Sequence, residues 1–339
     1  MIPHIDVLKR RFTRGAVVER RPQVLNGAHP VEQGLYILAT KEIQRLLEAV
    51  CQNIKNHAPG MIVYGRPRIG KSKAIEFIKD LIPGEVGQPI PVYSTFCRNY
   101  MRPSDTKFYA DMLHDFNFAL PSKKSPDDLR NQIVNFFKLH AEKSTLRRVV
   151  LFMDEAQRLT EWHYGWLMDI YNDLDKDKIS LTVISVGQSE LLGRRDYFLK
   201  NKKAQIIGRF MVHEHAYYGI KDVNDMKYFL ACYDEDTEFP EESQWSFTRY
   251  FFPESFQQGE RLKKCAKTLF NLFVELRREH GLAASQIEIP MEYLSITVDN
   301  ALKIYGANGK GHDWPSDNDW RDAIKKSGYI ESEIYMALA

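Results

Sequence analysis

Apolar residues in the first two thirds of the chain alternate between short continuous runs and longer stretches with helical spacing. Short runs rich in β-branched and aromatic residues predict strands at 61–64, 89–96, 149–153, 179–186 and 210–213, of which 89–96 alternates weakly. Apolar residues three and four positions apart predict helices between them, at 40–54, 73–78, 104–116, 126–141 and 161–174. Runs without polar alternation are typical of strands buried on both faces. The pattern therefore predicts an α/β domain with a five-stranded parallel sheet.

The pattern changes after about residue 218, beyond which no long β-rich run occurs. Helical spacing predicts helices at 222–230, 259–280 and 290–305 and a short helix from Ser316, while the acidic stretch 234–242 predicts an exposed loop. Residues 1–34 are polar and contain several prolines, as in an extended arm. We therefore expect an arm at 1–34, an α/β domain at 35–218 and an all-helical domain at 219–339.

A glycine-rich loop follows the first predicted strand and has the spacing G-x-x-x-x-G-K-S. Backbone N–H groups of such a loop surround nucleotide phosphates, and the following helix directs its positive dipole end at them. Lys71 would reach the β- and γ-phosphates, and the Ser72 hydroxyl would ligate Mg²⁺. The predicted nucleotide-binding residues are Gly65, Arg66, Pro67, Arg68, Ile69, Gly70, Lys71, Ser72 and Lys73.

Two carboxylates follow the apolar run 149–153, where the carboxyl end of a parallel strand places ligand-binding residues. Beside a phosphate-binding loop, Asp154 would hold Mg²⁺ and Glu155 would orient and polarise the attacking water. Taken alone, an Asp-Glu pair is more often a helix cap. Combined with the glycine-rich loop, it predicts an ATP-hydrolysing site.

Two further polar positions extend this prediction. The strand 179–186 ends in Gly187-Gln188, where Gln188 would lie beside the γ-phosphate as a sensor, with Ser185 as second choice and a simple turn as the alternative. Arg209 precedes the last predicted strand and would project as an arginine finger into the nucleotide of a neighbouring copy. Arg194 and Arg195 are the fallback for that role, and a solvated basic face is the alternative.

Composition limits the partners. The 339 residues carry 47 Lys+Arg against 45 Asp+Glu, so binding of a polyanion must come from local patches. The four cysteines are scattered, as in structural thiols of a cytosolic protein, and the first residues lack the apolar core of a signal peptide. We expect a cytoplasmic protein that does not span a membrane.

The order of phosphate-loop strand, β-strand, Asp-Glu strand, sensor strand, arginine-bearing strand and helical end resembles that of AAA+ P-loop NTPases, whose helical end is a lid. More narrowly, P-G-M-I-V-Y-G-R-P-R-I-G-K-S, V-V-L-F-M-D-E-A-Q-R-L and V-I-S-V-G-Q-S-E-L-L resemble the TnsC/TniB regulators of bacterial transposition. The resemblance covers roughly residues 35–220, and the chain is most similar to TnsC of CRISPR-associated transposons that use Cascade.

This resemblance implies an ATPase that binds ATP and Mg²⁺ between subunits and assembles on double-stranded DNA in the bacterial cytoplasm. The homo-oligomer would be a ring or filament with roughly six or seven subunits per turn. It would connect the transposase TnsA/TnsB with TniQ and its guide-RNA effector.

In such assemblies, DNA is contacted by residues after the second strand. Here the basic residues in that region are Arg98, Arg102 and Lys107, followed by a second cluster, Lys123 and Lys124. Arg68 departs from the small residue that many AAA+ loops have, and would bind nucleotide or contact a neighbour. The sequence does not assign a lid arginine facing the nucleotide; Lys310 and Arg321 are the candidates.

Other functions share these motifs. A replication initiator or helicase loader would have the same core, usually with a winged-helix domain for which the C-terminal sequence shows no strand pair. A nucleotide-gated scaffold with little hydrolysis would not need Glu155. A small-molecule P-loop kinase would need lid arginines over a substrate pocket, and the Asp154-Glu155 pair with the late Arg209 fits a ring ATPase better.

Overall fold

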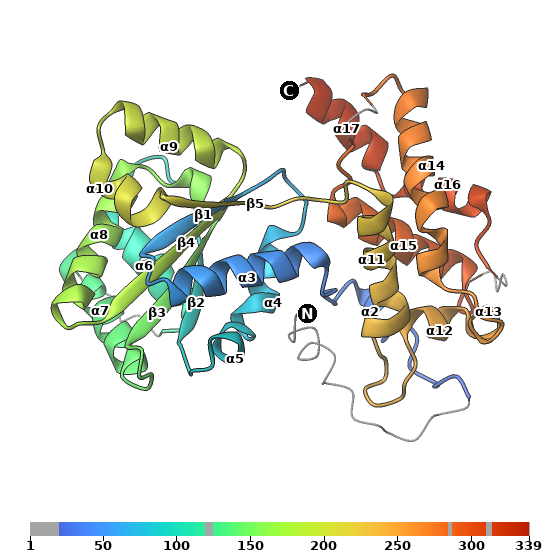
Figure 1. Ribbon diagram of the computed structural model, residues 1–339, viewed down its shortest axis with the longest axis horizontal. Coiled ribbons are helices and arrows are strands. Elements are labelled where there is room, and N and C mark those ends of the chain that lie inside the picture. Colours follow the sequence, from blue (N-terminus) through green and yellow to red (C-terminus); the bar gives the residue numbers. More distant parts are fainter. Residues whose placement is uncertain (1–19, 119–124, 284–286, 310–313, 339) are drawn as a thin grey trace. The chain divides into compact units, whose positions relative to one another are not determined.

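The computed structural model describes residues 20–118, 125–283, 287–309 and 314–338, which form two compact units. The α/β unit comprises Ile43–Pro67 and the described part of Lys71–Tyr217. The helical unit comprises the described residues up to Glu42, the stretch Arg68–Gly70 and the described residues from Tyr218 onward. Figure 1 shows the elements of each unit. The boundaries expected from the sequence, at 34 and 218, stay a proposal.

The α/β unit is built on one parallel sheet in the order β2-β3-β4-β1-β5. Its strands are β1 (Gly60–Tyr64), β2 (Val92–Phe96), β3 (Arg148–Asp154), β4 (Ser180–Gly187) and β5 (His213–Ala216). The central strand β4 lies between β1 and β3, and Ile184 pairs with Met61 on one side and Phe152 on the other. The expected five-stranded parallel sheet is confirmed. The carboxyl ends of β1, β3 and β4 consequently meet at one edge.

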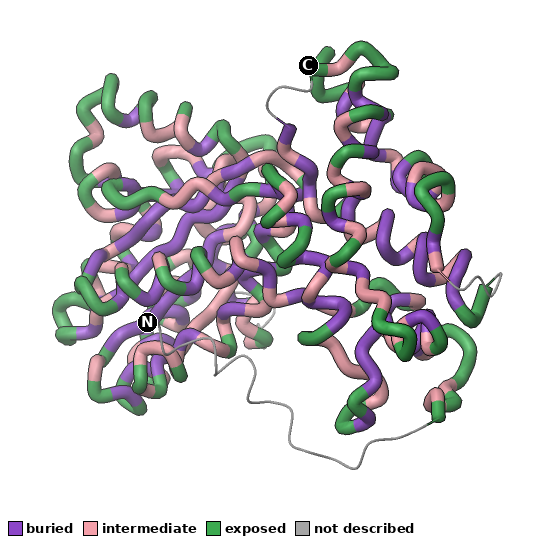
Figure 2. Tube along the Cα trace, turned by 45° about the vertical axis from the view of Figure 1, so that its right-hand side comes forward, coloured by how far each residue is buried: buried purple, intermediate pink, exposed green. Residues whose placement is uncertain are grey.

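Helices cover both faces of the sheet. They are α3 (Lys41–Lys55), α4 (Lys71–Lys79), α5 (Ile82–Val86), α6 (Asp105–Asp115), α7 (Pro126–Ala141), α8 (Glu161–Lys176), α9 (Glu190–Lys200) and α10 (Ala204–Ile206), with a 3-10 turn η1 (Ala156–Arg158) and a π-helix η2 (Ile207–Met211). On β3, Val149 and Leu151 face the core shared with α6 to α9, while Val150 and Phe152 are buried on the opposite side. There α3 and α4 lie across the sheet (Figure 1), and Figure 2 shows the strands as the most continuously buried segments.

The last strand differs from the prediction at 210–213. Phe210 and Met211 are fully buried in the π-helix η2, and the strand begins only at His213. β5 is an edge strand paired only with β1, so its first residues, His213 and Glu214, remain exposed. The apolar residues of the run 210–213 belong to a buried helical turn. The edge strand that follows is polar, so the hydrophobic pattern did not reveal it.

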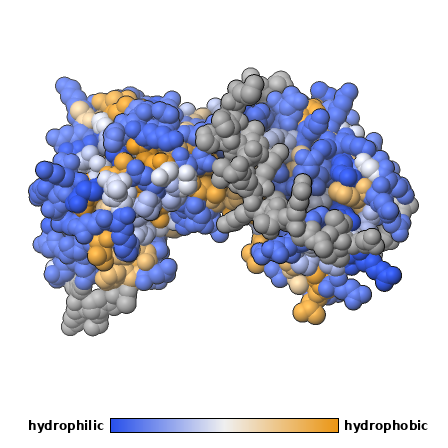
Figure 3. Space-filling model, turned by 60° about the horizontal axis from the view of Figure 1, so that its bottom comes forward, coloured by the Kyte–Doolittle hydropathy of each residue, from blue (hydrophilic) through white to orange (hydrophobic). Residues whose placement is uncertain are grey.

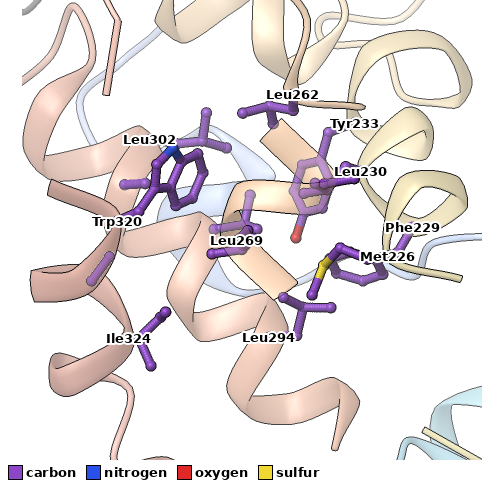
Figure 4. Close-up of a cluster of buried hydrophobic side chains, with 14 of the residues drawn as sticks. Met226, Phe229, Leu230, Tyr233, Leu262, Leu269, Leu294, Leu302, Trp320 and Ile324 are labelled. Atoms are coloured by element: carbon purple, nitrogen blue, oxygen red, sulfur yellow. The ribbon is translucent and has the colours of Figure 1, made fainter. Parts of the chain in front are cut away.

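The helical unit has a core of its own, part of which Figure 4 shows. Its helices are α2 (Pro30–Gln33), α11 (Val223–Ala231), α12 (Phe247–Phe251), α13 (Pro253–Gln257), α14 (Ala266–Glu279), α15 (Met291–Tyr305), α16 (Asp317–Lys326) and α17 (Tyr329–Leu338), with a π-helix η3 (Cys232–Asp236) and a 3-10 turn η4 (Leu262–Cys265). Leu269, Leu294 and Trp320 from three helices meet in this core. The expected helical C-terminal part is confirmed.

Residues before Glu42 contribute to this core. Val31 is fully buried in it, and the buried His29 imidazole is surrounded by four aromatic rings, those of Phe239, Phe247, Tyr250 and Phe251. His29 Nδ1 accepts the Val31 N–H at 3.1 Å. Burial and the nearby Arg21 charge lower the pKa of His29 from 6.5 to about 4. The residues leading to α3 are thus packed into the helical unit.

Two details of the helical prediction need correction. Asp234 belongs to the π-helix η3 and is buried, since its carboxylate accepts the N–H groups of Leu262 and Lys263 at 2.9 and 3.0 Å, so the acidic stretch does not begin as an exposed loop. The helix expected at 259–280 begins as the 3-10 turn η4 and becomes α-helical at Ala266.

The described surface is mainly polar. Figure 3 shows one face, where hydrophilic residues predominate and hydrophobic ones form separate patches. Among the described residues, no helix has the length and hydrophobicity needed to cross a membrane.

Candidate nucleotide-binding site

The glycine-rich loop joins the buried strand β1 to the start of α4. Gly70 has a φ of +93°, a left-handed conformation that favours glycine, and helix α4 begins at Lys71. Lys71 is 8% exposed, and its ammonium donates to the carbonyl oxygens of Gly65 at 2.9 Å and Arg66 at 2.7 Å. The loop therefore closes around its own lysine and holds a positive charge at the N-terminus of α4.

Arg68 is at the tip of this loop and belongs to the helical unit. Its guanidinium forms an ion pair with Glu292 at 3.0 Å and lies 5.5 Å from the centroid of the Tyr293 ring. Both charged side chains are about half exposed, so the pair adds little to stability. The remaining nucleotide-binding candidates in this stretch are Pro67, Ile69 and Lys73, of which Ile69 is buried and Lys73 is exposed.

The two phosphate-site motifs meet where β3 ends beside α4. The Ser72 hydroxyl donates to Asp154 Oδ2 at 2.6 Å. Burial raises the pKa of the Asp154 carboxyl above its ordinary value, against the opposing effect of the Ser72 hydrogen bond. Ser72 and Asp154 are far apart in sequence, and the fold brings their side chains together. They thereby place two hard oxygen donors, the ligands that Mg²⁺ prefers, next to each other.

Glu155 follows Asp154 directly and has a φ of +57°, which is uncommon for a residue with a side chain. Strained backbone of this kind occurs often at functional sites, where the surrounding structure maintains it. Gln157 Nε2 donates to Glu155 Oε2 at 2.8 Å, and Arg158 forms an ion pair with the same oxygen at 3.4 Å. Neither Gln157 nor Arg158 was assigned a role from the sequence, although both follow the Asp-Glu pair directly in D-E-A-Q-R.

The two sensor candidates differ in position on β4. Ser185 lies inside the strand, is fully buried and pairs with Ile62 and Met153 on the neighbouring strands. Gln188 follows the end of the strand, is half-buried and donates its backbone N–H to Gln157 Oε1 at 3.1 Å. Gln188 therefore lies close to the Asp154-Glu155 turn.

The arginine-finger candidates have separate surroundings. Arg209 lies in the π-helix η2, donates to Asn172 Oδ1 at 2.7 Å and lies 4.8 Å from the Tyr171 ring centroid, so it contacts α8. Arg194 donates to the Gln157 carbonyl at 3.1 Å, and Arg195 pairs with Glu214. The role of Arg209 as an arginine finger stays a prediction.

The predicted DNA-binding residues after β2 divide into two groups. Arg98 donates two hydrogen bonds to Asp115, at 2.7 and 3.1 Å, and lies 3.8 Å from Asp111. Burial alone would raise the pKa of Asp115, but hydrogen bonds from Arg98 and two other donors lower it below its ordinary value. Arg102 and Lys107, in contrast, are exposed. Arg98 is therefore engaged by Asp115 and Asp111, and the DNA-binding role of Arg102 and Lys107 stays a prediction.

Four predicted residues remain. Lys123, Lys124 and the lid candidate Lys310 lie outside the described residues. Arg321 forms ion pairs with Glu275 at 3.0 Å and Glu279 at 2.7 Å on α14. Its guanidinium is therefore engaged within the helical unit.

Comparison with known proteins supports the fold. The model of a family described as "AAA domain" matches residues 38–194, which contain both phosphate-site motifs. With the strand order β2-β3-β4-β1-β5 and the helical C-terminal part, the chain has the AAA+ P-loop fold. A search of curated proteins found no match.

Several solved structures are distantly similar. The Drosophila ORC bound to DNA shares 11% identity with a TM-score of 0.47, covering 95% of this chain and 73% of that one. The Aeropyrum pernix ORC1 protein in complex with DNA shares 12% identity, with a TM-score of 0.41 and coverage of 89% and 84%. Cdc6p from Pyrobaculum aerophilum shares 13% identity, with a TM-score of 0.37 and coverage of 95% and 84%. These similarities are too distant to support an argument about function.

Proposed function

We propose that this chain is an AAA+ ATPase that assembles on duplex DNA and regulates transposition, linking target-selection proteins to the transposase. The observation that carries the ATPase part is the 2.6 Å hydrogen bond between Ser72 and Asp154. It brings a hydroxyl from the phosphate-binding loop and a carboxylate from the neighbouring strand to one point. Such a pair is the protein contribution to a Mg²⁺-nucleotide site in P-loop ATPases.

The residues fit the metal and the nucleotide. Mg²⁺ is usually held by one or two protein oxygens together with phosphates and water, and Ser72 and Asp154 would supply those oxygens. When bound, Mg²⁺ neutralises charge on the phosphates. Because metal binding requires the ionised carboxylate, the raised pKa of Asp154 implies weaker binding at acidic pH.

Each of the other candidate side chains has a role in this proposal. Lys71 would exchange its two loop carbonyls for phosphate oxygens, a stronger charge-assisted contact. Glu155 would orient the attacking water and accept its proton. Gln188 would hydrogen-bond near the terminal phosphate, and Arg209 of a second copy would stabilise the charge that develops there.

The transposition part of the proposal rests on the three sequence stretches that resemble TnsC/TniB. Exposed Arg102 and Lys107 support contact with phosphates of DNA irrespective of its sequence. The proposed partners are therefore duplex DNA, further copies of the chain, the transposase TnsA/TnsB, and TniQ with its guide-RNA effector.

Glu155→Gln tests the enzymatic role, because it retains size and hydrogen bonding and removes the base. We expect it to bind ATP, lose turnover by about 10²- to 10⁴-fold, and accumulate on DNA. Lys71→Ala is the control that should lose ATP binding itself. Turnover within about twofold of the wild type in Glu155→Gln would contradict the role of Glu155.

The transposition role has a separate test. Purified TnsA/TnsB and TniQ should bind the protein on DNA in the presence of ATP and not in its absence. If neither TnsA/TnsB nor TniQ binds the protein assembled on DNA, the protein is not a TnsC/TniB regulator, even if it hydrolyses ATP.

A further inference from the structure

We propose that Gln157 is a positioning residue that holds Glu155 in the orientation needed to activate water, and that Gly187 is required to make room for it. The proposal rests on the ATPase function proposed above. It concerns a side chain that would touch neither nucleotide nor water. Gln157 would act through Glu155, by holding the carboxylate that carries out the chemistry in a fixed orientation.

The Gln157 side chain connects the carboxyl ends of the neighbouring strands β3 and β4 through both polar atoms of its amide. Nε2 donates to Glu155 Oε2 at 2.8 Å, and Oε1 accepts the backbone N–H of Gln188 at 3.1 Å. Its backbone carbonyl in turn accepts Arg194 Nε at 3.1 Å. These contacts settle which way the amide points, since only its nitrogen can donate to the carboxylate. We call this arrangement the Gln157 bridge.

The bridge gives the two oxygens of Glu155 different roles. Gln157 and Arg158 both contact Oε2, and the Arg158 guanidinium lies 3.4 Å from it. Arg158 also donates to the Cys97 carbonyl at 3.2 Å, so its guanidinium is itself held. Oε2 is therefore the anchored oxygen, and Oε1 is left to orient a water. A base held by a third group in this way matches the general pattern of activated catalytic groups.

The backbone conformation of Glu155 is consistent with a carboxylate that is held in place. With a φ of +57° the residue is in the left-handed region, outside the conformations that most side chains prefer. Strained positions persist only when surrounding contacts maintain them. The contacts from Gln157 and Arg158 fix the carboxylate after that turn, where a displacement of about 1 Å can cost 10²-fold in rate.

Gly187 shows that the bridge needs space at the end of β4. A Cβ atom at this position would lie 2.4 Å from Gln157 Oε1 and 3.1 Å from the Gln157 backbone nitrogen. The first distance is far below any normal contact, and the nearest atom is the end of a side chain that can move away. Alanine at position 187 is therefore expected to displace the amide of Gln157 while leaving most of the strand in place.

Two substitutions break the bridge from opposite sides. Gln157→Glu keeps the size of the side chain and an acceptor for the Gln188 N–H, but it replaces the donor to Glu155 with a like charge. Gly187→Ala leaves Gln157 unchanged and pushes its amide aside. Gly193→Ala on α9 is the matched control, because a Cβ there meets nothing within 4 Å.

The assay is steady-state ATP hydrolysis with duplex DNA, together with nucleotide affinity and thermal melting. Both bridge variants should lower kcat by about tenfold or more, a typical cost of losing a hydrogen bond that orients a catalytic group. Nucleotide affinity and melting of the two bridge variants should stay close to wild type, as should the kcat and the nucleotide affinity of Gly193→Ala. An unchanged kcat, an increased kcat, or a loss that merely follows weakened binding or melting would overturn the proposal.

A structural readout separates this proposal from the ATPase function itself. In crystal structures with a non-hydrolysed ATP analogue, the contact between Gln157 Nε2 and Glu155 Oε2 should be present in the wild type and broken in Gly187→Ala. If the wild type lacks it, or the variant keeps it, the bridge is wrong even if the chain is an active ATPase. If Glu155→Gln hydrolyses ATP normally, the proposed function is wrong, whatever the state of the bridge.

Discussion

Removing the two exposed cations that follow β2, Arg102 in the loop and Lys107 in α6, tests how this chain would contact DNA. Each phosphate contact contributes about 0.9 to the slope of log affinity against log salt on duplex DNA. Arg102 and Lys107 are exposed, so Arg102→Gln with Lys107→Gln should lower the slope by about 1.8. Salt rises fourfold between 50 and 200 mM, so over that range the double variant should lose about tenfold less DNA affinity than the wild type.

Arg98→Gln is the control within the same loop. The Arg98 guanidinium is already paired with Asp115 and lies near Asp111, so its charge is largely compensated inside the protein. We expect the slope to remain close to wild type and the melting temperature to fall, because Asp115 loses its bidentate partner. Fluorescence anisotropy with a labelled duplex at several salt concentrations measures both slopes.

Two outcomes would refute this reasoning. If the double variant keeps the wild-type slope, the DNA path lies elsewhere on the chain. If Arg98→Gln alone lowers the slope by about 0.9, Arg98 contacts a phosphate and is not committed to its acidic partners.

Three further predictions follow from the structure. Arg209→Ala should lower turnover of the assembled protein by about 10³-fold or more while the monomer still binds nucleotide; unchanged turnover would exclude Arg209 as the finger. The pKa of His29 is about 4 in the folded chain and 6.5 when unfolded, so its contribution to stability is present above pH 6.5 and is lost as the pH falls towards 4. His29→Phe should therefore reduce the loss of stability between pH 7 and 5 by about 2 kcal/mol in urea unfolding, and an unaltered pH dependence would show that His29 does not titrate in this way. Gly60→Ala should cost about 1 to 3 kcal/mol, since a Cβ there would lie 2.8 Å from two backbone carbonyl oxygens; a cost below about 0.5 kcal/mol would contradict that packing.

Local sequence signals predicted the elements that have strong local causes. Continuous apolar runs identified the buried strands β1, β3 and β4, because parallel strands covered on both faces need no polar alternation. Ser104, Asp222 and Ser316 each cap the helix that follows, as hydroxyl and carboxylate side chains at such positions do. β5 was misplaced because an edge strand with polar residues has no comparable local signal.

The sequence predicted only those residues of the candidate site that lie in contiguous motifs. The spacing of the glycine-rich loop and the Asp-Glu pair after a buried strand predicted which side chains would supply the phosphate and metal contacts. The roles of Gln157 and Arg98 depend on long-range partners, the end of β4 for one and α6 for the other. Nothing in the spacing of the chain indicates that these pairs meet, so only the folded structure reveals them.

The central claim is that nucleotide bound between copies of this chain holds them together around a duplex. Electron microscopy of the protein with duplex DNA and a slowly hydrolysed ATP analogue tests this claim most directly. We predict rings or filaments that enclose the DNA, with Arg209 of one copy at the triphosphate of the next. Monomers alone, over a wide range of protein and salt concentrations, would contradict it.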